Sequence, residues 1–182
     1  RRAPQARQLL LRADAPARVQ VLRERQRGAP GIGAAERQIF EAAGIAAYHA
    51  GRYAEALAEL RAARRISGSA DYLPMMADSE RGLGRPRRAL DLAADPAGAG
   101  LDEAGRAEML IVAAGARRDL GQLEAAAVAL QVPELRSQSG EPWVARLRYA
   151  YADALVALDR YEEARQWFVR AAASDEERQT DA

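Results

Sequence analysis

One short pattern returns four times along the chain: a turn residue, a bulky residue two positions later, then an alanine and a further apolar residue. The four copies read HAGRYAEALAEL, LGRPRRALDLA, LGQLEAAAVAL and LDRYEEARQWF. Aligned on their turn residues Gly51, Gly84, Gly121 and Asp159, they are 33, 37 and 38 residues apart. Self-similarity at such a period is typical of stacked supersecondary units, so the sequence predicts a series of helix–turn–helix repeats.

Apolar and small residues recur at helical spacing on both sides of each turn, which predicts one helix before it and one after it. Glycine ends a helix in the left-handed conformation without steric cost, and Asp159 can replace it because aspartate tolerates that conformation. Gly44 and Ala56 are small, so we expect them where the first two helices cross closely. The residues predicted to be buried are Phe40, Ala43, Gly44, Ala47, Tyr53, Ala56, Leu57, Leu60 and Ala63 in the first unit; Leu73, Met76, Ala77, Ala89, Leu90 and Leu92 or Ala93 in the second; Leu110, Ala113, Ala114, Leu123, Ala126 and Leu130 in the third; and Tyr151, Ala152, Leu155, Tyr161, Ala164, Phe168 and Ala171 in the fourth.

This order of residues resembles the tetratricopeptide repeat (TPR), a helix–turn–helix unit of about 34 residues. The resemblance covers residues 34–173 and is best in the first and last units. In the middle units Pro86 and Leu123 replace the aromatic residue after the turn, and the loops DPAGAGLDE and VPELRSQSGEP are longer than is usual in the family. The resemblance implies an all-α, TPR-like α-solenoid of about four repeats, preceded by a short helical N-terminal segment.

A closer resemblance is carried by the stretches AAGIAAYHAGRYAEALAELRAARR, YLPMMADSERGLGRP and LIVAAGARRDLGQLEAA. They are similar to an uncharacterised actinobacterial TPR family. This second resemblance implies a high-GC Gram-positive source and adds nothing on activity.

The composition agrees with a helical protein and excludes several kinds of site. Apolar residues make up 49% of the chain but aromatic residues only 5%, and the 27 basic residues are all arginine. Codon choice in a high-GC genome is the simplest explanation of the arginines, although arginine also binds carboxylate and phosphate in a planar, bidentate way. The absence of cysteine excludes disulfides, thiolate zinc sites and cysteine nucleophiles. No apolar stretch approaches the roughly 18 residues of a membrane span, and we expect a cytoplasmic protein.

The charge is unevenly distributed although the formal net charge is +1. Residues 1–37 contain nine arginines and three acidic residues, a balance of +6, whereas the tail from Ser174 has a balance of −3. We therefore divide the chain into a basic helical N-terminal segment with its connector (1–33), a TPR-like repeat domain (34–174) and an acidic C-terminal tail (175–182). The opposite signs of the two ends could steer a partner or another copy of the chain.

The sequence offers no convincing catalytic constellation, so we expect no enzyme, no cofactor and no metal site. His49 is the only histidine and stands near a predicted helix end, where it can interact with terminal carbonyls. The run GAPGIG at residues 28–33 lacks the Lys-Ser/Thr of a phosphate-binding loop and follows no strand. Paired acids such as Glu162 and Glu163 lie at predicted helix starts, which they stabilise through the helix dipole.

A binding function is the remaining prediction. The first helix of each unit lines the concave side of such a solenoid, so residues outside its buried stripe form the candidate groove. We predict a non-catalytic scaffold that binds a protein or peptide partner there, because aromatic and arginine side chains are frequent anchors. The predicted groove residues are Glu41, Ile45, Tyr48, Asp78, Arg81, Ile111, Arg118, Tyr149 and Asp153. A groove of the family that grips a C-terminal carboxylate through Lys/Arg and Asn residues is disfavoured, because the chain contains no asparagine.

Two alternatives remain open. The first is a nucleic-acid-associated adaptor that uses the arginine-rich N-terminal segment, although this segment has no aromatic residue to stack on bases. The second is self-association, in which the acidic tail of one copy meets the basic start of another. No membrane partner is expected.

Overall fold

The computed structural model describes residues 33–175 and 180. Within this part of the chain the structure is entirely helical, with eight α-helices, two short 3-10 helices and no strand, which confirms the all-α prediction. The predictions for the basic N-terminal segment, apart from Gly33, and for most of the acidic tail lie outside the described residues.

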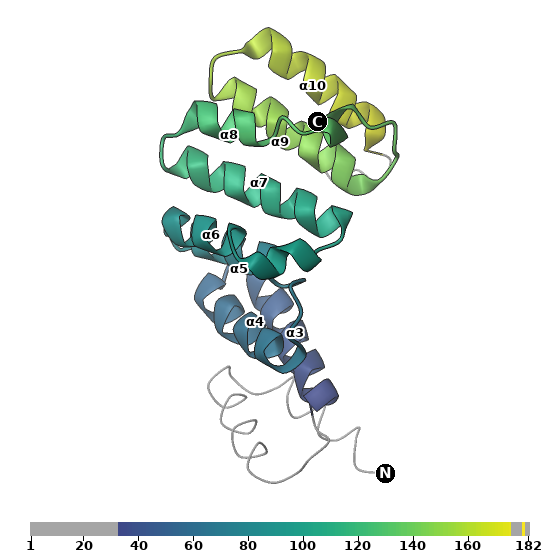
Figure 1. Ribbon diagram of the computed structural model, residues 1–182. Coiled ribbons are helices and arrows are strands. Elements are labelled where there is room, and N and C mark those ends of the chain that lie inside the picture. The colour runs from purple at the N-terminus through teal and green to yellow at the C-terminus, as the bar shows by residue number, and fades with distance from the viewer. Residues whose placement is uncertain (1–32, 176–179, 181–182) are drawn as a thin grey trace.

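The helices follow one another as antiparallel pairs. Contacts within pairs join α3 to α4, α5 to α6, α7 to α8 and α9 to α10, while contacts of α4 with α5, α5 and α6 with α7, and α7 and α8 with α9 join successive pairs. Figure 1 shows this order along the molecule, from α3 and α4 at one end to α9 and α10 at the other. The elements are α3 (Gly33–His49), α4 (Tyr53–Ser67), α5 (Leu73–Gly82), α6 (Pro86–Ala93), η1 (Pro96–Gly100), α7 (Glu103–Asp119), α8 (Leu123–Ala129), η2 (Pro133–Arg136), α9 (Pro142–Val156) and α10 (Tyr161–Ser174).

The four predicted turn residues are the ones that reverse the chain within each pair. Gly51, Gly84 and Gly121 have φ angles of 69°, 69° and 73°, and Asp159 has a φ of 58°. Only these residues and Gly68 have a positive φ in the described part of the chain. The left-handed conformation predicted from the sequence is therefore confirmed, including its occupation by aspartate in the last unit.

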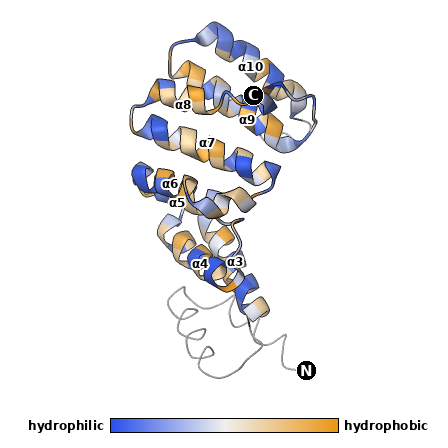
Figure 2. Ribbon diagram, in the orientation of Figure 1, coloured by the Kyte–Doolittle hydropathy of each residue, from blue (hydrophilic) through white to orange (hydrophobic). Residues whose placement is uncertain are grey.

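The apolar core is divided among the junctions of the helices. One cluster joins α3, α4 and α5 around Phe40 and Leu60, a second joins α5 to α7, and a third joins α7, α8, α9 and α10 around Leu147 and Leu155. The helices carry both hydrophobic and hydrophilic residues (Figure 2), as expected of helices that are buried on one face.

The close approach of α3 and α4 has a specific cause in Gly44. A Cβ atom at this position would lie 2.8 Å from the Leu60 side chain and 3.2 Å from the Leu60 backbone nitrogen. Ala56 on α4 is completely buried. The predicted need for a small residue at this crossing is confirmed for Gly44.

Most residues predicted to be buried are buried or half-buried, but the prediction is wrong for Tyr161, whose exposed fraction is 60%. Tyr53 occupies the same position two residues after its turn, and its ring lies against Gly82 of the next helix pair. No further pair follows α10 among the described residues, so Tyr161 has no surface of this kind to cover it.

Candidate binding face

The predicted groove residues occupy equivalent positions on the first helix of each pair. Tyr48, Arg81, Arg118 and Val156 stand three residues before their turn residues on α3, α5, α7 and α9. At these positions the backbone carbonyl accepts a hydrogen bond from the amide of the turn residue, at 2.8–3.0 Å. The turn thus fixes the last helical residues, and with them the direction of these side chains.

Two of these side chains reach an aspartate on the first helix of the next pair. The Tyr48 hydroxyl donates to Asp78 Oδ2 at 2.5 Å, and the Arg118 guanidinium donates to Asp153. Asp78 and Asp153 each stand six residues before the turn residue of their own pair. At two junctions, therefore, the side chain three residues before one turn contacts the aspartate six residues before the next turn.

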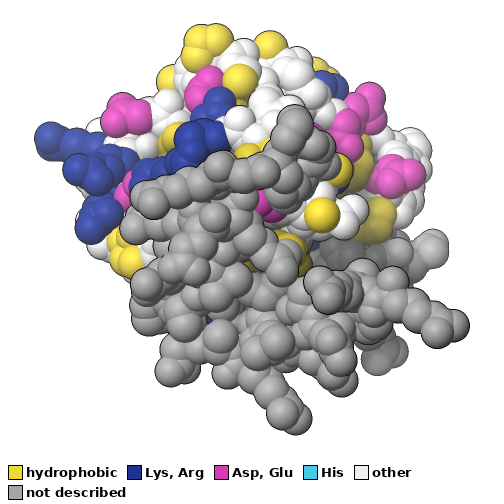
Figure 3. All heavy atoms as spheres, turned by 90° about the horizontal axis from the view of Figure 1, so that it is seen from below, with side chains coloured by type: hydrophobic (Ala, Val, Ile, Leu, Met, Phe, Trp, Pro, Cys, Tyr) yellow, Lys and Arg dark blue, Asp and Glu magenta, His cyan; other side chains and the backbone are white. Residues whose placement is uncertain are grey.

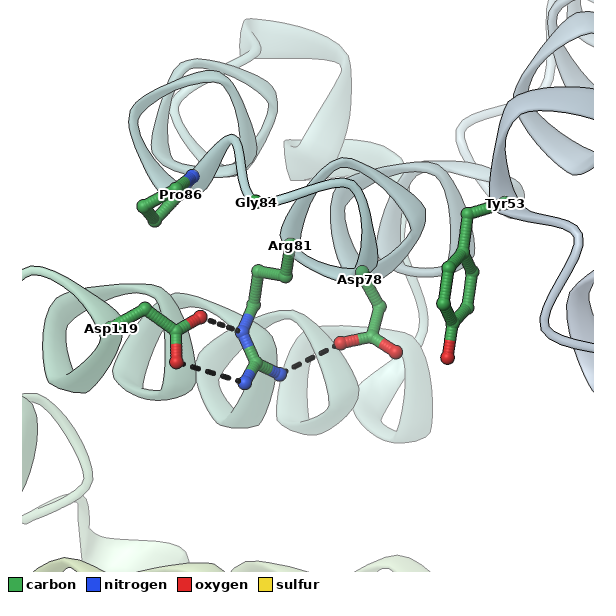
Figure 4. Close-up of a pocket in the computed structure, with 7 residues that line it drawn as sticks. Tyr53, Asp78, Arg81, Gly84, Pro86 and Asp119 are labelled. Atoms are coloured by element: carbon green, nitrogen blue, oxygen red, sulfur yellow. Dashed lines mark hydrogen bonds and ion pairs between the residues drawn. The ribbon is translucent and has the colours of Figure 1, made fainter.

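Arg81 departs from this rule because Gly115, not aspartate, stands six residues before Gly121. A Cβ atom at Gly115 would lie only 2.6 Å from Arg81 Cζ, so the guanidinium lies directly against the α7 backbone. Arg81 Nε donates to Asp119 Oδ2 at 2.9 Å, and Nη1 donates to Asp78 Oδ1 at 2.8 Å (Figure 4). Glycine thus moves the ionic contact to an acid four residues further along α7.

We call the surface formed by Tyr48, Asp78, Arg81, Asp119, Arg118 and Asp153 the first-helix face. Its charges are mutually compensated. Burial raises the pKa of Tyr48, and the hydrogen bond to Asp78 raises it further. Burial disfavours the charged form of Arg81, but the hydrogen bonds and charges of Asp119 and Asp78 outweigh this and raise its pKa. Both groups are therefore held in their protonated forms at neutral pH.

A second ionic contact joins α7 to α9 further from the turns. Arg146 Nη2 donates to Glu108 Oε2 at 2.7 Å. Burial raises the pKa of Glu108, and the charge of Arg146 opposes that rise. The exposed surface of the described residues also carries both signs: viewed from below, arginine side chains gather at one edge and Asp and Glu side chains lie at several other places (Figure 3).

Two cavities open on the first-helix face and share the Arg81 side chain. The larger, of about 410 Å³, is lined by Tyr53, Asp78, Arg81, Gly82, Gly84, Pro86 and Asp119 (Figure 4). The smaller, of about 120 Å³, is lined mainly by α5, α7 and α9 residues, among them Arg81, Ile111, Gly115, Arg118 and Asp153. The structure thus brings most of the predicted groove residues around one strip of surface.

Three predicted groove residues are placed differently. Glu41 accepts a hydrogen bond from Arg37 Nη1 at 2.7 Å within α3. The Tyr149 ring meets Phe168 of α10 edge-on, with ring centroids 5.2 Å apart. Ile45 is half-buried and lines neither of the two cavities. It stands six residues before Gly51, where Asp78 and Asp153 stand in later pairs, but the described residues hold no earlier pair to offer a cation.

Sequence reasoning missed Asp119 and the role of Gly115. A signal was present in the register, since the alignment on turn residues places Asp78, Gly115 and Asp153 in one column and Arg81 and Arg118 in another. Charged residues in two such columns indicate pairing across the junctions. The exception at Gly115 is not visible in the register, because the register does not show that Arg81 bonds Asp119 instead.

The other candidate residues make only local contacts, and Glu162 and Glu163 form ion pairs with Arg165 and Arg160, each three residues away. His49 is exposed, and its ring lies edge-on to Tyr48 with centroids 5.5 Å apart. No group of three or more His, Asp or Glu side chains in residues 33–175 and 180 is arranged to hold a metal ion. None of the described helices is long and apolar enough to cross a membrane. The nucleic-acid alternative rests on a segment that lies almost wholly outside the described residues, and it stays a prediction.

Comparisons of the chain with protein-family models, with curated proteins and with solved structures give no significant match.

Proposed function

We propose that this chain is a TPR-like solenoid scaffold that binds an extended segment of a protein partner along the first-helix face. The observation that carries the proposal is the pair of cavities that share Arg81 and are lined by side chains of three successive first helices. A strip that crosses several repeats suits an extended peptide, since each repeat can contact a few residues of it.

The side chains of this strip retain capacity for a ligand. Arg118 has five N–H donors and uses one of them on Asp153. The exposed fractions of the Arg81 and Asp119 side chains are 27% and 37%, so a partner can reach both without unfolding the junction. Because the arginines and aspartates of this face already form ion pairs with each other, charged groups of the partner replace existing ion pairs and do not meet unpaired charges. Specificity then comes from the apolar contacts beside them, such as Ile111.

Site-specific photo-crosslinking in cells of the source organism tests the location. A photoreactive amino acid at position 111 reports on the smaller cavity, whereas the same group at position 128 is the control, because Val128 is 65% exposed on α8 outside the face. We expect a defined protein adduct from position 111 and none of the same mass from position 128.

The combined variant Arg81→Ala/Arg118→Ala then tests the side chains. It is expected to lower the crosslinking yield at position 111 by at least about tenfold, because each lost charged hydrogen bond weakens binding by about 1.5–3 kcal/mol. Arg165→Ala, at an exposed arginine on α10, is the matched control and should leave the yield unchanged. Equal adducts from both positions, or an undiminished yield in the double variant, would rule out the first-helix face as the docking site.

A further inference from the structure

Three arginines line one cavity in the last helix pair, at the end of the pair that lies away from its turn. The cavity, of about 570 Å³, is lined by Arg136 of η2, Arg148 of α9 and Arg170 of α10, together with Ser137, Ser139 and other residues of the loop after η2 and the end of α10. The arginines come from three separate elements, so their convergence is a property of the fold and not of one basic run in the sequence.

The charge in this cavity is not compensated in the way seen on the first-helix face. No Asp or Glu is among the described residues that line it. The ion pairs formed within residues 33–175 and 180 include none of these three arginines. Arg81 and Arg118, by contrast, each have an aspartate partner.

Arg148 is held in place by neutral groups. Its Nε donates to the Leu135 carbonyl at 3.1 Å, its Nη1 donates to the Arg170 carbonyl at 3.4 Å, and its Nη2 donates to the Ser137 carbonyl. These bonds fix the guanidinium and leave two of its five N–H groups without a bond among them. Burial, and then the charge of Arg170, lower the pKa of Arg148, as expected where like charges meet without an acid.

Arg170 is also positioned by a neighbour on its own helix. Its Cζ lies 4.5 Å from the centre of the Trp167 ring, a cation–π contact that orients the side chain without neutralising it. Two oriented guanidinium groups and a third beside them therefore surround the cavity, and none of the three forms an ion pair with a described acidic residue.

We propose that this cavity binds a phosphate group, held by Arg136, Arg148 and Arg170 and by the hydroxyls of Ser137 and Ser139. Arginine presents a planar fork of donors that matches the oxygens of phosphate. A phosphate dianion offsets more of the clustered charge than one carboxylate can, and its several oxygens can accept from all three arginines at once. The site is separate from the first-helix face and does not depend on the function proposed for it.

Calorimetric titration of the full chain with inorganic phosphate, at constant ionic strength, tests the proposal. We expect one saturable site that is weakened at least about tenfold in Arg136→Ala/Arg170→Ala, since a hydrogen bond to a charged group contributes about 1.5–3 kcal/mol. Both substituted residues are exposed, so this variant should keep its fold, which the helical circular dichroism signal will show. Arg165→Ala on α10 is the control for general charge and should bind as the unsubstituted chain does.

Two further ligands identify the chemistry and its source. Acetate should bind much more weakly than phosphate. Titration with O-phosphoserine tests whether the phosphate is carried by a side chain. If phosphoserine binds more tightly than inorganic phosphate, the natural ligand is a phosphorylated side chain and not free phosphate. The absence of saturable phosphate binding, equal binding by the double variant, or acetate binding as tight as phosphate binding would each overturn the proposal.

Discussion

The first and the last helix pairs carry the same residue type two positions after the turn, with opposite outcomes. Tyr53 lies so close to α5 that a Cβ atom on Gly82 would be 2.3 Å from its ring, whereas Tyr161 is 60% exposed. The positions three residues before the turns differ in the same way. Tyr48 bonds Asp78 of the next pair, and Val156 is 37% exposed. In this chain a residue near the turn is stabilised mainly by the pair that follows it.

This difference shows that one helix pair alone does not bury all of its own side chains. A pair such as α3 and α4 buries its own crossing through Gly44 and Leu60, but it leaves its turn-proximal side chains to be completed by α5. Stability in such an array comes from each pair plus its interface with the next one. The interior junctions should therefore respond strongly to substitution and the last turn weakly.

The largest expected effect separates the two tyrosines. Tyr53→Ala removes a ring packed between two pairs and should lower the free energy of unfolding by about 3 kcal/mol, near the lower end for aromatic truncations in cores. Tyr161→Ala should leave it unchanged within error, because the ring is exposed. Urea denaturation followed by circular dichroism measures both. If the two variants lose equal stability, the comparison between covered and uncovered turns is wrong.

A smaller effect tests the surface that covers Tyr53. Gly82→Ala places a methyl group 2.3–2.7 Å from ring atoms, and overpacking of this kind should destabilise the protein by about 2 kcal/mol. Gly115→Ala meets only the end of the Arg81 side chain, which can move away. Alanine also favours the helix over glycine by about 1 kcal/mol, which offsets the displaced arginine.

The same denaturation experiment applied to these two variants has a clear adverse outcome. If Gly115→Ala is destabilised as much as Gly82→Ala, the flexible Arg81 guanidinium and the aromatic ring present equal obstacles. The rigid Tyr53 ring would then not be the feature that defines the first junction.

The elements that could be predicted from the sequence are those that repeat within one unit. The left-handed turn residues and the buried stripes depend on local backbone conformation and on helical period, and both are visible in a single sequence. The contacts between pairs depend on how far one pair is rotated and shifted against the next. Asp78 and Arg81 could thus be proposed as groove residues, but the bonds that they make with Tyr48 and Asp119 of the neighbouring pairs could not.

The exposure of Tyr161 was missed for a related reason. The sequence pattern gives it the same surroundings as Tyr53, and the pattern does not show that the described array ends after α10. The arginine cavity was missed because Arg136, Arg148 and Arg170 lie 12 and 22 residues apart and on different elements. Only the return of the loop after η2 towards the end of α10 brings them together.

A third prediction concerns ion pairs at an interior junction and on the last helix. A double-mutant cycle on Arg118 and Asp153 should give a coupling energy of about 0.5–1 kcal/mol that decreases in 1 M NaCl, as expected of partly exposed pairs. The cycle on Arg165 and Glu162, which are 74% and 88% exposed and 3.8 Å apart within α10, should give no measurable coupling. Coupling of equal size in both cycles would mean that the cross-junction register adds nothing.

The last expected effect depends on pH and tests the first junction alone. The raised pKa of Tyr48 means that the folded protein keeps its hydroxyl proton at pH values where the unfolded chain, with an ordinary pKa of about 10, has lost it. The stabilisation from Tyr48 is therefore complete below pH 10 and is lost as the pH rises further. Tyr48→Phe should be less stable than the unsubstituted chain by about 1 kcal/mol at pH 7, because the hydrogen bond to Asp78 is gone.

That difference should shrink towards zero between pH 9 and pH 11, since phenylalanine has no proton to lose and the other tyrosines titrate equally in both proteins. Urea denaturation at several pH values across this range measures it. Tyr161→Phe provides the control at the other end of the array, with a pKa raised by its hydrogen bond to Asp159 on an exposed surface. A gap for Tyr48→Phe that stays constant up to pH 11 would show that the bond to Asp78 does not persist in solution. The first two pairs would then be joined by the packing of Tyr53 on Gly82, the apolar cluster around Phe40 and Leu60, and the ion pair of Arg61 with Glu80.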